Sequence, residues 1–389
     1  MTERPRVALF VESSSEFGRM ILRGIRRYLH AHAAWSIYLQ QRDLNTRLPA
    51  WLDGWRGNGI ISRSTSPKFA ELIRKSGLPM VDLTDRWGAL GVPQIWADHA
   101  GIGRMAADHL IERQFRHFAF AGFERESWSD LRKEGFSSCL EKSGFTAQVY
   151  DSPWDPVAGR SWDDEFAALV AWIQRLPKPV GIMAANDVRG QQILDACCEA
   201  GLAVPEQAAV IGCDNDAIRC ELCDPPLSSV IPNAERIGYR SAELLQQLMT
   251  GSPSPAEREI VEPLGITTRK STDILAIDDP DIAAAVRIIR ERALFGLRVE
   301  DILAEVPVSR STLERGVRKY LRRSPQSEIR RVQLQHACDL LVETDMTLPE
   351  IAKRCGFVHP EYFSVVFKRA YTLTPGQYRT LHASGHGEV

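Results

Sequence analysis

The stretch IAKRCGFVHPEYFSVVFKRAY, Ile351–Tyr371, contains two runs of apolar residues with helical spacing that meet at Gly356. A glycine between two such runs is typical of a tight turn, because glycine readily adopts the left-handed backbone conformation that ends a helix. The second run opens with His359 and Pro360, and proline is favoured at the first position of a helix. We therefore predict a helix, a tight turn and a second helix here.

The same arrangement is predicted earlier in the chain. Residues 299–321 read VEDILAEV, PVS and RSTLERGVRKYL, and residues 348–371 contain the stretch quoted above. Ser309 is expected to cap the second helix of the first unit, with Ser311 and Glu314 in the S-x-x-E relation of a helix start. A long helix predicted over Glu328–Glu343 would separate the two units. In the second helix of each unit, the apolar residues expected to face inward are Leu313, Val317, Tyr320, Leu321, Phe363, Val366 and Phe367.

Positive charge gathers in this part of the chain. The 389 residues carry a formal net charge of −2, but residues 281–380 hold 17 Lys and Arg against 12 Asp and Glu. This region therefore has a net charge of +5 and the remainder −7. The segment Arg310–Arg331 alone has eight basic residues against Glu314 and Glu328. A basic cluster beside two helix-turn-helix units predicts contact with DNA phosphates.

The second helix of each unit supplies the predicted DNA contacts. A helix held out by a tight turn can enter the major groove with its first residues at the base edges, while later basic residues contact phosphates. The helix over Glu328–Glu343 would be roughly 24 Å long at ~1.5 Å per residue. With the widths of the flanking helices added, this is compatible with two grooves ~34 Å apart. The alternative interpretation is a helical dimerisation or docking domain. The predicted DNA-binding residues are Arg310, Ser311, Thr312, Arg315, Arg318, Lys319, His359, Pro360, Glu361, Tyr362, Ser364, Lys368 and Arg369.

The run TLPEIAKRCGFVHPEYFSVVFKRAYTLTPGQYR, Thr347–Arg379, resembles the signature of AraC/XylS-type transcription regulators. It matches the pattern I-A-x-x-x-G-F, then Y-F, then F-K-[KR], then T-P-x-x-Y-R. His359 stands where that family usually has an acidic residue or serine, and Gly316 where it often has arginine. The resemblance implies a DNA-binding domain over 276–389. The expected partners are operator half-sites in promoter DNA, a second copy of the chain in a homodimer, and RNA polymerase.

Residues 1–275 alternate short β-rich runs with helical ones. Predicted helices between the strands include residues 20–29, 100–113 and 189–201. Strands that alternate with helices indicate parallel sheets covered on both faces. So many units indicate an α/β domain of two doubly wound lobes, followed by the all-α domain. The predicted strands are Val7–Val11, Asn58–Ile61, Met80–Leu83, Gln94–Ala97, His117–Phe123, Val180–Ala185 and Ala208–Asp214.

Polar and aromatic side chains follow these strands. Open α/β sheets bind ligands at the carboxyl ends of their strands, and carboxylates, amides, arginines and aromatic faces together suit a polyhydroxylated ligand. The alternative for each single Asp or Asn is a helix cap. The predicted ligand-binding residues are Ser13, Glu16, Phe17, Arg19, Asp85, Trp128, Arg132, Asn186, Asp187 and Asp214.

Three stretches of this part resemble the effector domains of lactose- and galactose-type repressors. They are AANDVRG (184–190), VIGCDND (210–216) and DPPLSSVIPNAERIGYRSAELL (224–245). The resemblance covers roughly Arg6–Thr268 and implies the two-lobed fold of periplasmic sugar-binding proteins. By that resemblance Asp85, Arg132, Asn186 and Asp214 contact the sugar.

An effector domain of this kind followed by an AraC-type tail resembles a family of bacterial pentose-operon regulators. The stretches EFGRMILRGIRRYL (16–29) and RKSTD (269–273) share in that resemblance. It implies D-xylose as the effector and activation of pentose-utilisation genes. A regulator that responds to another sugar remains an alternative.

Other classes of protein are disfavoured. The sequence contains no apolar run of 18 residues that could span a membrane and no apolar N-terminal core of a secretion signal, so we expect a cytoplasmic protein and not a transport binding protein. Without a nucleophile elbow, P-loop or metal signature, an enzyme with an accessory tail is also disfavoured. Cys220 and Cys223 form a C-x-x-C pair without a fourth ligand at zinc spacing. We therefore expect no metal and no cofactor.

Overall fold

The computed structural model describes residues 4–32, 34–39, 55–88, 90–154, 161–252, 258–274, 277, 279–321, 323–344, 346–357 and 359–383. The chain divides into two compact units, Met1–Asp273 and Ile274–Val389. The domain boundary predicted between residues 275 and 276 falls on residues outside the described ranges. Within these ranges, no helix is both long and apolar enough to cross a membrane.

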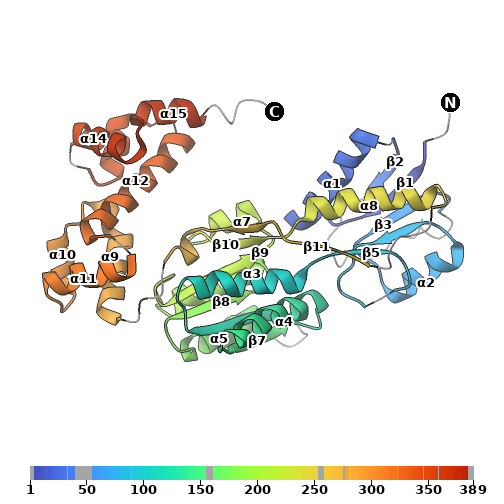
Figure 1. Cartoon of the computed structure of the whole chain (residues 1–389), viewed down its shortest axis with the longest axis horizontal. Coiled ribbons are helices and arrows are strands. Elements are labelled where there is room, and N and C mark those ends of the chain that lie inside the picture. The colour runs from blue at the N-terminus through green and yellow to red at the C-terminus, as the bar shows by residue number, and fades with distance from the viewer. Residues whose placement is uncertain are drawn as a thin grey trace. The chain divides into compact units, whose positions relative to one another are not determined.

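The first unit is built on two six-stranded sheets (Figure 1). The strand order of the first sheet is β11 (Arg258–Val261), β5 (Gln94–Ala97), β4 (Met80–Asp82), β3 (Gly59–Ser62), β1 (Arg6–Phe10) and β2 (Ser36–Leu39). That of the second is β12 (Gly265–Thr267), β10 (Ser228–Ile231), β9 (Ala208–Cys213), β8 (Val180–Ala184), β6 (His117–Glu124) and β7 (Ala147–Pro153). The described pairs are parallel except β10–β12.

Helices cover both sheets. The first sheet carries α1 (Glu16–His32), α2 (Pro67–Ser76) and α8 (Ala234–Met249). The second carries α3 (His99–Glu112), α4 (Ser127–Lys142), α5 (Trp162–Arg175), α6 (Asp187–Glu199), α7 (Ala217–Leu222) and a 3-10 turn at Lys270–Thr272. The chain passes from one sheet to the other after β5, β10 and β11. Each sheet with its helices is a lobe, so the predicted doubly wound two-lobed α/β architecture is confirmed.

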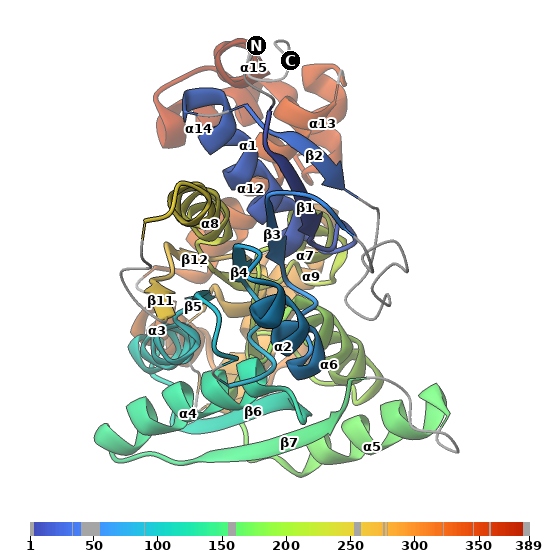
Figure 2. The same cartoon turned by 90° about the vertical axis from the view of Figure 1, so that its right-hand side faces the viewer.

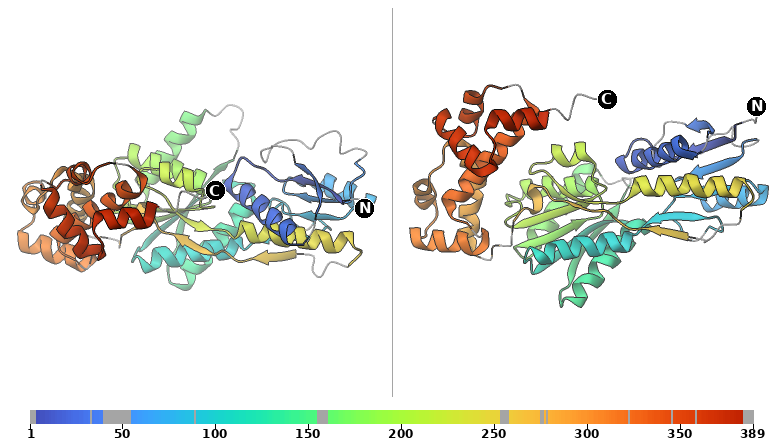
Figure 3. Two further views of the ribbon diagram at one scale, coloured as in Figure 1. Left: turned by 90° about the horizontal axis from the view of Figure 1, so that it is seen from above. Right: turned by 45° about the horizontal axis from the view of Figure 1, so that its top comes forward.

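Helix pairs pack tightly in both lobes. α1 lies along α8 (Figure 3), and α3 packs against α4, above which it is seen end-on in Figure 2. A Cβ atom added at Gly24 would lie 2.0 Å from the carbonyl oxygen of Glu235, and one added at Gly103 would lie 2.1 Å from that of Arg132. Glycine therefore sets the close approach in each pair, and any larger residue would push the helices apart.

The central strands are buried, and the strands missed from the sequence lie at sheet edges or are short. Every residue of β3, β8 and β9 is buried, as expected for strands covered on both faces. β2 and β7 are edge strands, and every residue of β2 is exposed. β11 and β12 are the opposite edges and have four and three residues. Such strands lack the continuous apolar run that identifies a buried strand.

The second unit is all-α. Its elements are α9 (Pro280–Arg292), a 3-10 turn at Ala293–Phe295, α10 (Val299–Glu305), α11 (Arg310–Leu321), α12 (Pro325–Glu343), α13 (Leu348–Arg354), α14 (Pro360–Tyr371) and α15 (Pro375–Ala383). One core forms around α9, α10 and α11, and a second around α13, α14 and α15. α12 contributes Ile329 to the first and Leu341 to the second. This is the predicted all-α domain with two helix-turn-helix units.

The turn and cap predictions can be compared with this unit directly. Gly356 has a φ of 75°, as the tight turn requires, and Pro360 is the first residue of α14. The Thr312 backbone amide donates to Ser309 Oγ at 3.2 Å, so Ser309 caps α11. α11 begins at Arg310, so Ser311 lies inside its first turn and is not the cap. α12 starts at Pro325, three residues before the predicted Glu328, because Ser324 caps it and proline suits its first position.

Candidate functional site

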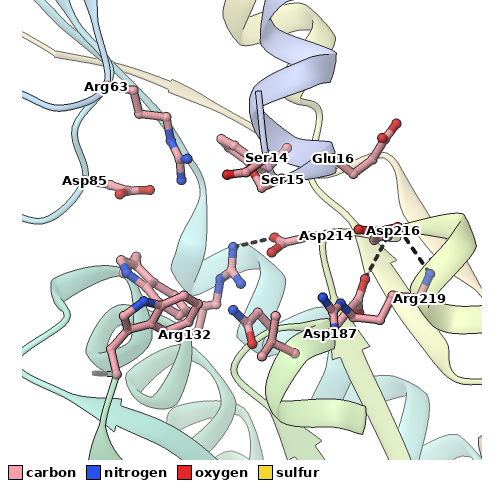
Figure 4. Close-up of a pocket in the computed structure, with 15 residues that line it drawn as sticks. Ser14, Ser15, Glu16, Arg63, Asp85, Arg132, Asp187, Asp214, Asp216 and Arg219 are labelled. Carbon is pink, nitrogen blue, oxygen red and sulfur yellow. Dashed lines mark hydrogen bonds and ion pairs between the residues drawn. The ribbon is translucent and has the colours of Figure 1, made fainter. Parts of the chain in front are cut away.

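The first unit contains a cavity of about 260 Å³ at strand ends of its two lobes (Figure 4). Charged and polar side chains dominate its walls. Figure 4 shows Arg63, Asp85 and the loop Ser14–Glu16 facing Arg132, Asp187 and Asp214 across it. The lining residues are Ser14, Ser15, Glu16, Phe17, Arg63, Asp85, Trp128, Arg132, Trp154, Asn186, Asp187, Val188, Asp214, Asp216 and Arg219.

Eight of the ten residues predicted to bind a ligand line this cavity. They are Glu16, Phe17, Asp85, Trp128, Arg132, Asn186, Asp187 and Asp214. Ser13 and Arg19 are not among its lining residues. Arg19 instead donates to the backbone carbonyl oxygens of Ser13 and Ser14, each at 3.1 Å, and to Glu16 Oε2 at 2.9 Å. Its guanidinium therefore holds the loop that carries the lining residues.

Arg132 on α4 connects the buried charges of the site. Its Nη2 donates to Asp214 Oδ1 at 3.3 Å, and its Nε donates to His99 Nδ1 at 3.3 Å. Because Nδ1 of His99 accepts, the imidazole proton lies on Nε2, which donates to Asp85 Oδ2 at 3.0 Å. Burial lowers the pKa of His99 despite the neighbouring Asp85 carboxylate, which fits a neutral ring. A continuous chain of hydrogen bonds thus joins Asp85 of the first lobe to Asp214 of the second.

Asp85 is held in its ionised form. Burial raises its pKa, but the hydrogen bond from His99 and the charges of Arg63 and Arg132 outweigh burial and lower the pKa to about 2. An ionised carboxylate only accepts hydrogen bonds. Asp85 is therefore suited to receive hydrogen bonds from hydroxyl groups of a ligand.

Two further carboxyl groups of the site lie close enough to interact, that of the buried Asp187 and that of the half-buried Asp214. Asp187 Oδ1 accepts from Ser229 Oγ at 2.6 Å, and its Oδ2 accepts from the Asp216 backbone amide at 2.8 Å. Burial, followed by the charge of Asp214, raises the pKa of Asp187 to about 7. Burial also raises the pKa of Asp214, partly offset by Arg132 and Arg63. Asp214 has a φ of 106°, a strained conformation for a non-glycine residue that is typical of functional sites.

The side chain of Asn186 has one polar atom that caps a helix and a second that is available to a ligand. Its Oδ1 accepts from the backbone amide of Arg189 at 2.9 Å and so caps α6. The cap interpretation is therefore correct for its oxygen. Its amide nitrogen can still donate into the cavity that the residue lines.

The sequence interpretation missed Arg63, although the rule it applied would have found it. Arg63 directly follows β3, at the carboxyl end of a predicted strand. It forms an ion pair with the fully buried Glu12, and its guanidinium carbon lies 4.4 Å from the centre of the Phe17 ring. Among the other missed residues, Trp154 follows the unpredicted strand β7, and Arg219 lies on the short helix α7. Val188 and Asp216 were also missed, whereas Ser14 and Ser15 belong to the loop after the first strand in which the sequence predicted ligand contacts.

The chemistry of the site suits a small polyhydroxylated molecule. Carboxylates, three arginines and an amide can pair with hydroxyl groups, while Phe17 and Trp128 offer apolar faces. The described residues contain no group of three or more His, Cys, Asp and Glu that could hold a metal ion. Cys220 and Cys223 are buried, and burial raises the pKa of the Cys223 thiol to about 11. Burial therefore favours the thiol over the thiolate at Cys223.

In the second unit the predicted DNA-binding residues lie at the surface. Thr312, Pro360 and Ser364 are half-buried. Val365, on the same face of α14, is 65% exposed. The exposed residues are Arg310, Ser311, Arg315, Arg318, Lys319, His359, Glu361, Tyr362, Lys368 and Arg369.

Arg310 and Tyr362 are among the predicted DNA-binding residues that have partners within the unit. Arg310 Nη1 donates to Glu300 Oε1 at 2.8 Å, and its Nε lies 3.6 Å from Glu314 Oε1. The Tyr362 ring is 51% exposed and lies 5.0 Å from the guanidinium of Arg330. The two helices therefore differ. α11 exposes an arginine, Arg310, that is paired with glutamates, whereas α14 exposes the Tyr362 ring, packed against Arg330, and Val365.

Three family models match the chain. Residues 6–89 match an XylR N-terminal domain, residues 107–272 a periplasmic binding protein-like domain, and residues 302–380 a helix-turn-helix domain. The first two lie within the unit that contains the cavity, and the third covers α11–α14.

Curated relatives match over almost the whole chain. The xylose operon regulatory protein of Escherichia coli (strain K12) is 30% identical, over 98% of this chain and 98% of the relative. The protein of the same name from Haemophilus influenzae is 29% identical, over 97% of this chain and 99% of the relative.

Comparison with solved structures finds the same family. The structure of the xylose-binding transcription activator xylR covers 98% of this chain and 99% of that chain, with a TM-score of 0.82 and 29% identity. The transcriptional regulator CelR–cellobiose complex covers 70% of this chain and 86% of that chain, with a TM-score of 0.56 and 26% identity. The chain therefore belongs to the family of xylose operon regulatory proteins, and it is a sugar-responsive transcription regulator of the helix-turn-helix class.

Proposed function

We propose that the protein is a D-xylose-dependent activator of pentose-utilisation genes and not an enzyme. The observation that carries this proposal is the similarity over the whole chain to proteins named for xylose and for activation. The cavity supports it. At about 260 Å³ it is slightly smaller than most small-molecule pockets, which start at roughly 300 Å³, and this suits a monosaccharide.

Each part of the cavity has a role in this proposal. The carboxylates of Asp85 and Asp214 accept hydrogen bonds from sugar hydroxyls, and Arg132 donates to a sugar oxygen. Phe17 and Trp128 pack against the C–H face of the ring. Glu16, Asn186 and Asp187 complete the polar contacts.

Helix α3 provides a route for the signal within the first unit. Its first residue, His99, joins the hydrogen-bond chain of the cavity. Towards its other end, His109 Nε2 lies 2.8 Å from Thr272 Oγ1, and Arg113 Nε donates to the Thr272 carbonyl oxygen at 2.6 Å. Thr272 precedes the last residue of the unit, Asp273. A shift of α3 on sugar binding would therefore move the segment from which the chain continues into the DNA-binding unit.

Sugar binding can change DNA binding only if the protein has two conformations with different affinities for the sugar. Sugar favours the conformation to which it binds more tightly, and the same free energy favours the DNA-binding arrangement linked to it. In a homodimer the two DNA-binding units would then be placed on operator half-sites. Such an activator would contact RNA polymerase at the promoter, and it would act in the cytoplasm, where bacterial DNA lies.

The test is calorimetric titration of the purified full chain with D-xylose, D-ribose, L-arabinose and D-glucose. We expect D-xylose to bind more tightly than the other three. Tighter binding of another sugar would replace D-xylose as the proposed effector and would leave the protein a sugar-responsive regulator. Absence of binding by all four would contradict the assignment of the cavity, and turnover of any pentose would contradict the exclusion of an enzyme.

A further inference from the structure

A second cavity, of about 170 Å³, adjoins the first. The two share Arg63, Asp85, Trp128 and Trp154 as lining residues. The remaining walls of the second cavity come from the loop Ser64–Ser66 after β3, from Thr84, Arg86 and Trp87 after β4, and from Glu126. None of these lines the first cavity. The cleft of the first unit therefore has two chambers that meet at four shared side chains.

The second chamber contains polar atoms that lack partners. Ser64 Oγ and Arg63 Nε are both buried without a hydrogen-bond partner in the part of the chain that the structure describes. Buried polar atoms are almost always hydrogen-bonded, because leaving one unpaired costs free energy. Their surface is covered by protein, so the polar groups that a ligand in this chamber can reach are those of the ion pair between Arg86, 40% exposed, and Glu126.

Aromatic rings continue from one chamber into the other. Trp128 and Trp154 line both, with ring centres 5.8 Å apart and planes at 84°. Trp128 Nε1 donates to Glu126 Oε2 at 3.0 Å, which fixes the orientation of its ring. Trp87, 41% exposed, belongs to the second chamber alone. A wall of this kind offers apolar surface to two sugar rings in succession.

We propose that the two chambers form one site for a disaccharide of pentose units. One ring occupies the first cavity, and the second ring lies in the second chamber against Trp87, with Arg86 and Glu126 as its hydrogen-bond partners. This inference rests on the proposed function, because it takes the first cavity to hold a pentose. It extends the ligand class from a monosaccharide to a disaccharide.

Calorimetric titration of the full chain with D-xylose and with its β-1,4-linked disaccharide tests the inference. We expect the disaccharide to bind about tenfold more tightly, the difference that about 1.4 kcal/mol of added contact would produce. Trp87→Ala should remove most of this gain and leave the affinity for D-xylose unchanged. Ser64→Phe, which fills the second chamber, should do the same. Trp162→Ala is the matched control, because Trp162 is 63% exposed on α5 and lines neither cavity.

The outcomes separate this inference from the proposed function. If D-xylose binds and the disaccharide binds no more tightly, the claim that the second chamber holds a second sugar ring is wrong, and the proposed function still stands. Trp87→Ala weakening both sugars equally would also overturn it. Absence of binding by both sugars would contradict the proposed function itself. The thermal unfolding midpoint of each variant, compared with that of the wild-type protein, identifies any variant that fails to fold.

Discussion

The sugar cavity and the two recognition helices, α11 and α14, use charge in opposite ways. In the cavity the charged groups are buried or half-buried and already paired: Arg132 bonds to His99 and Asp214, and Asp85 to His99. On α11 and α14, Arg318, Lys368 and Arg369 are exposed to solvent. Burial strengthens each interaction and makes the loss of a partner costly, whereas solvent screens exposed charges and leaves each worth little. Substitutions should therefore have large effects in the cavity and smaller effects on the helices.

The largest expected effect is that of Asp214→Ala. The substitution removes the carboxylate that accepts from Arg132 and leaves that buried guanidinium with one partner fewer. We expect the affinity for D-xylose to fall more than about 100-fold, in line with roughly 3 kcal/mol for a broken buried pair, while DNA affinity is retained. Calorimetry and gel-shift titration measure the two affinities. Asp195→Ala, at an exposed position on α6, is the control. Equal loss of sugar and DNA binding in a folded Asp214→Ala protein would contradict the division of roles.

Substitutions on the recognition helices should have the next largest effects, and of two kinds. Arg315→Ala, near the start of α11, should cost about 1–3 kcal/mol of DNA binding at particular base pairs. Arg369→Ala, near the end of α14, should weaken binding to all sequences and reduce the slope of log affinity against log salt by about 1. Titration of selected and scrambled duplexes at several salt concentrations distinguishes the two. Arg287→Ala, exposed on α9, should change neither. A salt slope unaffected by Arg369→Ala would exclude a phosphate contact there.

This contrast also explains what the sequence could predict. Tyr362 and Lys368 lie on one contiguous helix, so periodicity and the turn at Gly356 were enough to place them on an exposed face. The cavity joins distant segments, and its Arg132–Asp214 bond links residues 82 positions apart. The strand-end rule still found eight lining residues, because the ends of parallel strands meet at one edge of a sheet. It missed Trp154, since edge strand β7 was not predicted, and it included Arg19, whose hydrogen bonds to its own loop only the folded structure reveals.

A pH effect of intermediate size should come from Asp187. Its pKa in the folded protein, about 7, lies above the ordinary value of 3.8 because of burial and the nearby Asp214. The folded state therefore binds a proton that the unfolded state releases, and the contribution of this group to stability falls as pH rises from about 4 to about 7. The thermal unfolding midpoint of the wild-type protein should decline over that range relative to that of Asp187→Asn. Parallel pH profiles for the two proteins would show that Asp187 does not titrate there.

The smallest effect is expected from Glu300→Gln on α10. Glu300 holds Arg310 at the start of α11, and both side chains are more than half exposed. Freeing the arginine should raise DNA affinity about two- to fivefold at low salt, and the gain should vanish as salt screens the interaction. Gel-shift titration at low and high salt measures this change. Glu305→Gln, which frees Arg292 on α9 instead, is the matched control. Weaker DNA binding by Glu300→Gln would mean that the tether orients Arg310 for the groove.

The most direct test of the central claim measures DNA binding of the full chain with and without D-xylose. The probe is a duplex that the full chain itself selects from a randomised library in the presence of D-xylose. We expect D-xylose to increase the affinity of the wild-type protein for this duplex about tenfold, which is within the usual range of allosteric coupling, and to leave that of Asp214→Ala unchanged. An equal response to D-xylose in both proteins, or none in the wild-type protein, would contradict the claim that this cavity controls DNA binding.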